Sequence, residues 1–273
     1  MALRLALLLL LSACSKDAAS SPGPPLGRGD AVVLPNGSVY RVLQAGPVLR
    51  GTGASTGGGI MYWSDSAAPS RVSRDAQQLV AAFGPELELA GEKLLSVQAK
   101  IPGGLEGQTT TVTRGFRLER GQWLPHPPEP VPAEPIAGEA PPAPSDPVLA
   151  NLAARLTAAG SAAARWLDHL DLDPVEGVVS RMNDEFRGQI KGAPERWLQI
   201  TQQRRQLKLT ERRSELYRME TPSKSPKLGP GDTVLVQYQS GTARRRVLER
   251  VIMVKEPAGW RVGGYAFEPL PQL

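Results

Sequence analysis

Clusters of histidine, cysteine and carboxylate side chains most often carry acid–base or metal chemistry, and this chain has one conspicuous cluster. The stretch "LDHLDLD" places His169 beside Asp168, Asp171 and Asp173. A histidine among carboxylates can bind a metal ion or exchange a proton near neutral pH. The usual zinc ligand sets are missing, because His126 is the only other histidine and the chain has a single cysteine. We therefore interpret the cluster as a polar helix end followed by an N-cap, and we predict no metal and no cofactor.

Other catalytic signatures are absent from the sequence. It contains no Gly-x-Ser-x-Gly, no His-Glu-x-x-His and no Walker pattern. "GTGASTGGG" at residues 51–59 is similar to a phosphate-binding loop only in composition, because a strand rather than a helix follows it. We interpret it as a flexible loop. His126 opens a proline-rich stretch and is expected to be solvent-exposed. The sequence therefore predicts a protein that is not an enzyme.

Four aromatic residues could either line a binding pocket or fill a core. They are Trp166, Phe186, Trp197 and Trp260. Core packing is our interpretation, with a pocket as the alternative. Strand alternation puts Trp260 and Val262 on one face and Arg261 on the other, so Trp260 is expected inside.

Basic residues gather late in a chain whose net charge is +5. They are Arg204, Arg205, Lys208, Arg212, Arg213, Lys224, Lys227, Arg244, Arg245 and Arg246. Such density could attract nucleic acid, lipid headgroups or an anionic polymer. We interpret these residues as a solvated basic face, and attraction to an anionic membrane is the alternative.

The N-terminus has the layout of a secretory signal. Arg4 is followed by an apolar run at 5–11 and then by Ser12, Ala13 and Cys14. The run is far shorter than the ~20 residues of a spanning helix. Leu11-Ser12-Ala13-Cys14 resembles the lipobox of bacterial lipoproteins, which implies cleavage before Cys14 and acylation of its thiol. The alternative is an ordinary signal beside which the cysteine falls by chance.

Lipidation would also explain why the chain has a single cysteine, and it would attach the protein to a membrane. An exported chain with a free thiol risks mispairing, and here acyl chains would consume the only thiol, Cys14. Two or more chains give stable anchoring. We expect a lipid-anchored protein on the periplasmic face of the bacterial cell envelope. Ser15, rather than the aspartate that retains enteric lipoproteins in the inner membrane, favours the outer membrane.

Composition divides the chain into five parts. A linker of 126–146 has proline at about every second or third position, so it is expected to be an extended spacer. The expected parts are a signal peptide at 1–13, a tether at 14–29, a small α+β domain at 30–125, the linker, and a second α+β domain at 147–270.

The first domain has the expected order β-β-β-α-β-β. Asn36-Gly37 between apolar runs predicts a hairpin. Apolar spacing of three and four residues from Ser70 predicts a helix that Gly91 ends and that Gly84-Pro85 could kink. Two strands, 93–101 and 109–124, are expected after it.

The second domain places its helices before its strands. An apolar stripe from Leu149 to Leu170 predicts the first helix, 173–186 the second, with Asp173 as its N-cap, and 193–207 the third. Four strands are expected at roughly 208–219, 233–240, 244–255 and 259–267. This order indicates helices packed on an antiparallel meander.

The residues of this second domain carry a resemblance. "ARWLDHLD", "GAPERWLQITQQRRQL", "GDTVLVQYQS", "LERVIMVKE" and "GWRVGGYAF" together resemble the bacterial domain of unknown function 4019 over about 150–268. The ending matches the family at Gly259, Trp260, Arg261, Val262, Gly264 and Tyr265. "TPSKSPKLGPGD" is longer and more basic than the usual turn there. The resemblance implies a nuclear-transport-factor-2-like, cystatin-like fold with helices on a curved, cone-like sheet, and no known activity.

We therefore expect an envelope-anchored lipoprotein that acts as a non-enzymatic binding or scaffold module. Its expected partners are the membrane, through its lipid, and an envelope protein or an anionic polymer, but not nucleic acid. A small-ligand-binding protein that uses a cavity in the second domain is the alternative. An enzyme of the cone-fold type comes third, since it rests on fold analogy alone.

Overall fold

The computed structural model describes residues 30–49, 55–102, 109–127, 147–172, 175–207, 209, 213–222, 232–242 and 245–271. They belong to two compact units, Ser21–Ser145 and Asp146–Gln272. In each unit helices pack on a sheet, so the expected α+β class is confirmed. Cys14, the tether and the linker from residue 128 onward lie outside the described residues.

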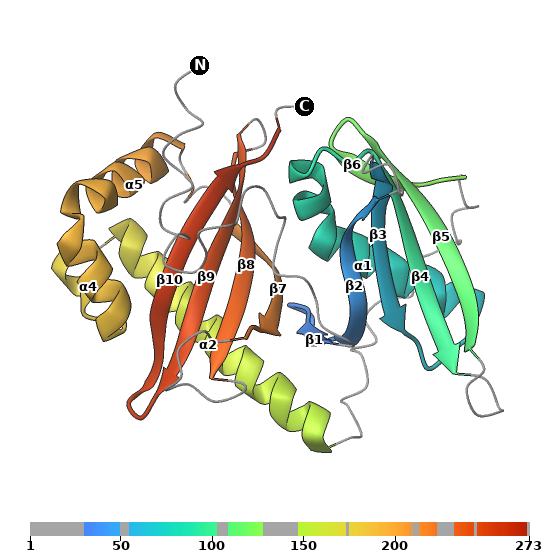
Figure 1. Ribbon diagram of the computed structural model, residues 1–273, viewed down its shortest axis with the longest axis horizontal. Helices are drawn as coiled ribbons and strands as arrows, with labels where there is room; N and C mark the ends of the chain where they lie inside the picture. The colour runs from blue at the N-terminus through green and yellow to red at the C-terminus, as the bar shows by residue number, and fades with distance from the viewer. Residues whose placement is uncertain are drawn as a thin grey trace. The chain divides into compact units, whose positions relative to one another are not determined.

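The first unit is a sheet with one helix across it (Figure 1). Its elements are β1 (Asp30–Val33), β2 (Val39–Leu49), β3 (Ser55–Trp63), α1 (Pro69–Leu89), β4 (Leu94–Pro102), β5 (Thr109–Glu119) and β6 (Gln122–Pro125). The strands neighbour one another in chain order, and all pairs are antiparallel except β3 and β4. Helix α1 supplies the crossover that a parallel pair requires.

Helix α1 has the predicted buried face and the predicted end. Val72, Leu79 and Phe83 are among its buried residues and pack toward the sheet. Pro69 stands at its start, where the missing N–H costs nothing. At its end Gly91 has a φ of 85°, and its N–H donates to the carbonyl of Glu88 at 2.9 Å. A left-handed residue of this kind is the usual helix stop.

Two details of the first unit differ from the expectation. The strand predicted at 109–124 is a hairpin, because Arg120 and Gly121 have φ values of 47° and 74° and reverse the chain. The loop predicted at 51–59 overlaps β3, which begins at Ser55. Glycines suit this strand because Gly58 packs under Leu87 and Gly59 lies under Val48.

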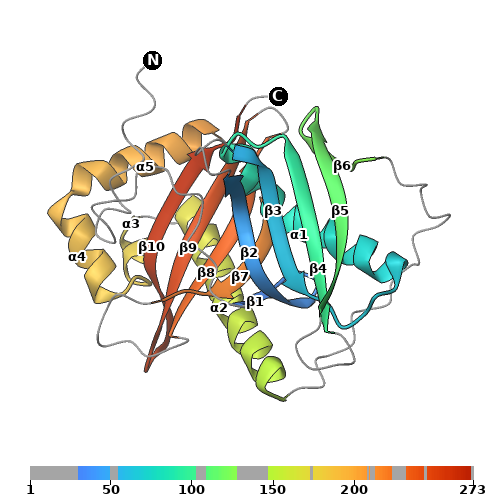
Figure 2. The ribbon, with the colours of Figure 1, turned by 45° about the vertical axis from the view of Figure 1, so that its right-hand side comes forward.

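The second unit has helices first and a meander after them. Its elements are α2 (Pro147–Leu172), α3 (Val175–Val179), α4 (Asp184–Gly192), α5 (Pro194–Leu207), β7 (Arg213–Glu220), β8 (Thr233–Gly241), β9 (Arg246–Glu256) and β10 (Gly259–Pro269). Consecutive strands pair antiparallel. Helix α2 contacts all four strands, α4 contacts α5 and β10, and the long strands curve (Figure 2).

The helix predicted at 173–186 is two helices, α3 and α4. The chain becomes helical again after Asn183, which caps α4 because its Oδ1 accepts a hydrogen bond from the N–H of Phe186 at 2.8 Å. The N–H of Asn183 also donates to the carbonyl of Val262 at 2.9 Å, so the break lies along the edge of β10. Val178, Met182 and Phe186 are all buried, which explains why their four-residue spacing suggested one helix.

Strand β10 does not alternate regularly, and Trp260 is not in the core. A bulge between Val262 and Gly264 shifts the register, so Tyr265 and Phe267 turn inward after Val262. Trp260 lies at the hairpin end, is only part-buried, and has the Lys255 ammonium 5.5 Å from its ring centroid. The expectation that Trp260 lies inside is wrong, because the hairpin end next to it is exposed.

Candidate functional site

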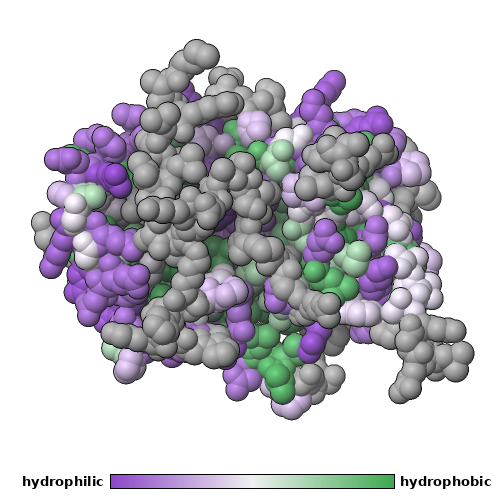
Figure 3. Space-filling view, viewed as in Figure 1, coloured by the Kyte–Doolittle hydropathy of each residue, from purple (hydrophilic) through white to green (hydrophobic). Residues whose placement is uncertain are grey.

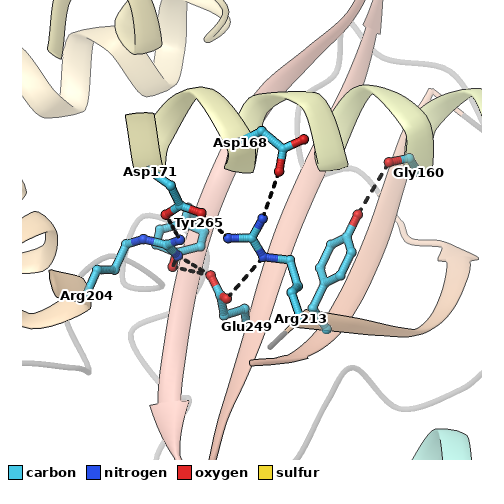
Figure 4. A network of polar contacts seen from close by, with 8 residues as sticks. Gly160, Asp168, Asp171, Arg204, Arg213, Glu249 and Tyr265 are labelled. Carbon is cyan, nitrogen blue, oxygen red and sulfur yellow. Dashed lines mark hydrogen bonds and ion pairs between the residues drawn. The ribbon is translucent and has the colours of Figure 1, made fainter. Parts of the chain in front are cut away.

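The polar groups that meet inside the second unit form its candidate site (Figure 4). We call them the ion network: Asp171 from α2, Arg204 from α5, Arg213 from β7, Glu249 from β9 and Tyr265 from β10. Each comes from a different element, so the network ties the helices to the sheet. Buried charges of this kind are either structural or functional, and their pairing decides between the two.

Arg204 is the centre of the network. Its Nη1 donates to Glu249 Oε2 and to the Tyr265 hydroxyl, and its Nη2 donates to Asp171 Oδ1. The Tyr265 hydroxyl in turn donates to Glu249 Oε2 at 2.6 Å. The Arg204 and Glu249 side chains are 4% and 0% exposed, so water screens neither charge.

Arg213 connects the network to the surface. Its Nη2 donates to Asp171 Oδ2, and its Nε lies 3.7 Å from Glu249 Oε1. Its Nη1 donates to Asp168 Oδ1 at 3.2 Å, and the Asp168 side chain is 67% exposed. Asp171 therefore bridges two guanidinium groups, one deep and one close to solvent.

The electrostatics of the network favour the charged state of Arg204 and the neutral state of Tyr265. Burial lowers the pKa of Arg204, but the electrostatic interactions with Tyr265, Glu249 and Asp171 outweigh it and raise that pKa above its ordinary value. Burial, and then the charge of Glu249, raise the pKa of Tyr265 well above its ordinary range. Tyr265 therefore keeps its proton and remains a donor to Glu249.

This arrangement is a structural lock, because it holds α2 and α5 to β7, β9 and β10. Two guanidinium groups face two buried carboxylates, so the charges balance. A general acid or base needs a titratable group that is free to exchange its proton with a substrate. Both carboxylate oxygens of Asp171 and Oε2 of Glu249 instead accept hydrogen bonds from arginines of the same chain, and Glu249 Oε1 lies 3.7 Å from Arg213 Nε.

A comparison with family models finds a match within this unit. Residues 162–265 match the family described as "Protein of unknown function (DUF4019)". We refer to the second unit, which includes this match, as the DUF4019 domain. No curated protein and no solved structure matches the chain. Among the described residues, no helix has the length and apolar character that crossing a bilayer requires.

Three of the four predicted aromatics lie inside the DUF4019 domain, in two ring pairs. Trp166 packs edge-on against Tyr265 with ring centroids 5.3 Å apart, and Phe186 packs edge-on against Trp197 at 6.3 Å. All four rings are buried, whereas Trp260 stands apart at the hairpin end. The indole N–H groups of Trp166 and Trp197 have no hydrogen-bond partner among the described residues.

The residues of "LDHLDLD" serve the ion network instead of forming a separate centre. Asp168 and Asp171 pair with arginines, His169 is part-buried, and Asp173 lies outside the described residues. No group of three His, Cys, Asp or Glu in the described part of the chain could hold a metal ion. His126 is exposed, with Nε2 3.4 Å from Nη2 of Arg117.

Two of the predicted basic residues lie in the ion network and not on the expected solvated face. Arg204 and Arg213 are drawn into the ion network, Arg246 is part-buried, and Arg245 is exposed. The structure does not describe the side chains of Arg205, Lys208, Arg212, Lys224, Lys227 and Arg244. The overlooked signal was Glu249, a carboxylate within the apolar strand "RVLERVIMV". A buried carboxylate requires a buried cation.

A smaller polar cluster lies in the core of the first unit. The Tyr40 hydroxyl is 3.0 Å from Asp75 Oδ1 and 2.7 Å from Gln78 Oε1, and Arg71 Nε lies 3.5 Å from the same Asp75 oxygen. Burial raises the pKa of Asp75, although the Tyr40 hydrogen bond and the Arg71 charge oppose it. Burial, and then the charge of Asp75, raise the pKa of Tyr40 and that of Tyr62. This cluster holds α1 against β2.

Proposed function

We propose that the protein is a lipid-anchored binding or scaffold module of the bacterial cell envelope that catalyses no reaction. The observation that supports the proposal is the packing of side chains in the interior of the DUF4019 domain. Trp166 and Tyr265 pack against each other, as do Phe186 and Trp197, and the buried carboxylates pair with arginines. A domain whose interior is occupied in this way would bind a partner through its surface and not at an internal active site.

The anchor is the second part of the proposal. Leu11-Ser12-Ala13-Cys14 supports cleavage before Cys14, attachment of acyl chains such as palmitate to the thiol, and retention at the periplasmic face of the outer membrane. The proline-rich residues between the two units then act as a spacer. Two modules on a tether can reach a partner at a distance from the bilayer.

Mass spectrometry of the membrane fraction tests this proposal. The mature chain should begin at Cys14 and carry added acyl mass. Cys14→Ser should abolish both the added mass and the cleavage, and Ser15→Ala is the matched control that should leave both intact. An unmodified mature chain that begins at another residue would contradict the anchor.

Binding of a small ligand inside the DUF4019 domain is the second candidate. The unpartnered indole N–H groups of Trp166 and Trp197 favour it, because each could donate to an acceptor that a ligand brings. The two candidates differ in one measurable respect. A ligand in the interior would move the signals of these two indoles, and a partner on the surface would leave them unchanged.

A further inference from the structure

The face of the first unit's sheet that points away from α1 has an unusual composition. On the α1 side, Val42, Tyr62 and Ala99 are buried and lie in register on three neighbouring strands. Side chains alternate along a strand, so the residues next to them point the other way. Those residues are Arg41, Trp63 and Lys100.

Trp63 stands between two cations. Arg41 on β2 and Lys100 on β4 are its direct partners in register, and neighbouring strands lie about 4.8 Å apart. The Trp63 side chain is 39% exposed, which is high for an indole. Among the described residues Arg41 has no hydrogen bond or ion pair, and Lys100 Nζ donates to the neutral Thr111 Oγ1 at 2.8 Å. Both charges are therefore available to an anion.

Uncharged hydrogen-bonding groups surround this row. These groups belong to four residues, Gln44, Gln98, Thr111 and Thr113, on the same face of β2, β4 and β5, and the apolar Met61 of β3 lies between the two glutamines. Figure 3 looks onto this face, and purple and pale residues dominate over β4 and β5. We name Arg41, Trp63 and Lys100, with these four residues around them, the Trp63 platform.

We propose that the Trp63 platform binds an anionic polysaccharide. The apolar C–H face of a sugar ring would stack on the indole, and acidic groups on either side would pair with Arg41 and Lys100. The glutamines and threonines would bind the hydroxyl groups. This proposal rests on the proposed function, and it specifies the partner as a charged envelope glycan.

Charge and hydrogen bonding favour this partner over three others. A bilayer would bury Gln44, Gln98 and the threonines without returning their hydrogen bonds. Single-stranded nucleic acid needs aromatic side chains for successive bases, and Trp63 is the exposed aromatic of this row. The centre of a protein interface is depleted of charged residues, whereas two cations stand at the centre here.

The test is calorimetric titration of the full-length chain in detergent with a galacturonate hexamer. We expect saturable binding at about 0.05 M salt that weakens at about 0.2 M. Trp63→Ala should weaken binding about three- to tenfold, and Trp63→Phe, which keeps an aromatic plane, should retain most of it. Joint Arg41→Gln and Lys100→Gln should weaken it about tenfold or more. Arg74→Gln, an exposed cation on α1, is the matched control and should change nothing.

Four results would overturn the proposal. They are no binding of the hexamer, equal binding of an uncharged dextran hexamer, affinity that survives the platform variants, and tighter platform-dependent binding of oligothymidylate or of phosphatidylglycerol vesicles. Thermal unfolding of each variant shows whether a lost affinity reflects lost folding. Acylation of Cys14 is measured separately, so an unmodified cysteine would contradict the anchor without affecting the binding result.

Discussion

Replacement of Arg204 by methionine removes the centre of the ion network while keeping a long apolar side chain. The change takes three hydrogen-bond donations away from Glu249, Tyr265 and Asp171. Glu249 is fully buried and keeps only the Tyr265 hydroxyl and the Arg213 Nε at 3.7 Å. The variant therefore leaves a buried carboxylate with little compensation.

The expected loss is about 3–5 kcal/mol of unfolding free energy, the range for removing one partner of a buried ion pair. A domain of this size has about 5–15 kcal/mol in total, so the second unit should be severely destabilised. Arg187→Met is the matched control. Arg187 pairs with Asp184, whose side chain is 98% exposed, and its loss should cost less than about 1 kcal/mol.

Urea unfolding of the full-length chain measures both variants, and hydrogen exchange of β9 peptides assigns the transition to the second unit. A second substitution, Glu249→Gln, should recover part of the loss in Arg204→Met, because Asp171 and Arg213 then remain as a balanced pair. We expect a coupling energy of about 1–3 kcal/mol. If Arg204→Met is as mild as Arg187→Met, the network is not a structural lock.

Three further predictions concern titration and packing. Tyr265 keeps its proton in the folded state, whereas an unfolded tyrosine loses its proton above about pH 10. The contribution of Tyr265 to stability should therefore be constant below about pH 10 and then fall by about 1.4 kcal/mol per pH unit. Tyr265→Phe should remove this part of the slope in alkaline urea titrations. Asp75 has a raised pKa, so its contribution to stability is present below about pH 3.9 and is lost as the pH rises. The thermal unfolding midpoint of Asp75→Asn, measured relative to that of the unmodified protein, should therefore increase as the pH rises from about 3 to 7. A difference between the two midpoints that does not change with pH would refute this. Trp166→Ala should cost about 3–5 kcal/mol in urea unfolding and Trp260→Ala clearly less, and equal losses would mean that Trp260 is as well packed as Trp166.

Local patterns in the sequence predicted most of the elements. The three- and four-residue apolar spacing of α1 and α2, the Asn36-Gly37 turn and the stop at Gly91 all depend on neighbours in the chain. The class of the second domain followed from the order of helices and strands. The family match over 162–265 agrees with the resemblance seen in the sequence motifs.

The features that the sequence did not reveal depend on distant partners. Arg204 and Glu249 are 45 positions apart, so nothing near Arg204 distinguishes it from a surface arginine. The break at Asn183 and the register shift before Gly264 both depend on the pairing of residues around Met182 with Val262. The Trp63 platform requires the register of three strands, two of them parallel, which alternation within one strand does not specify.

The central claim is that the DUF4019 interior is occupied by its own side chains. The most direct measurement is a nitrogen-15 NMR spectrum of the five tryptophan indole N–H groups, recorded on the chain from residue 15 onward. We predict that the Trp166 and Trp197 signals exchange slowly with water and do not move when a library of small apolar and hydrogen-bond-accepting ligands is added. A saturable shift of either signal with one ligand would contradict the claim and identify a binding pocket in its place.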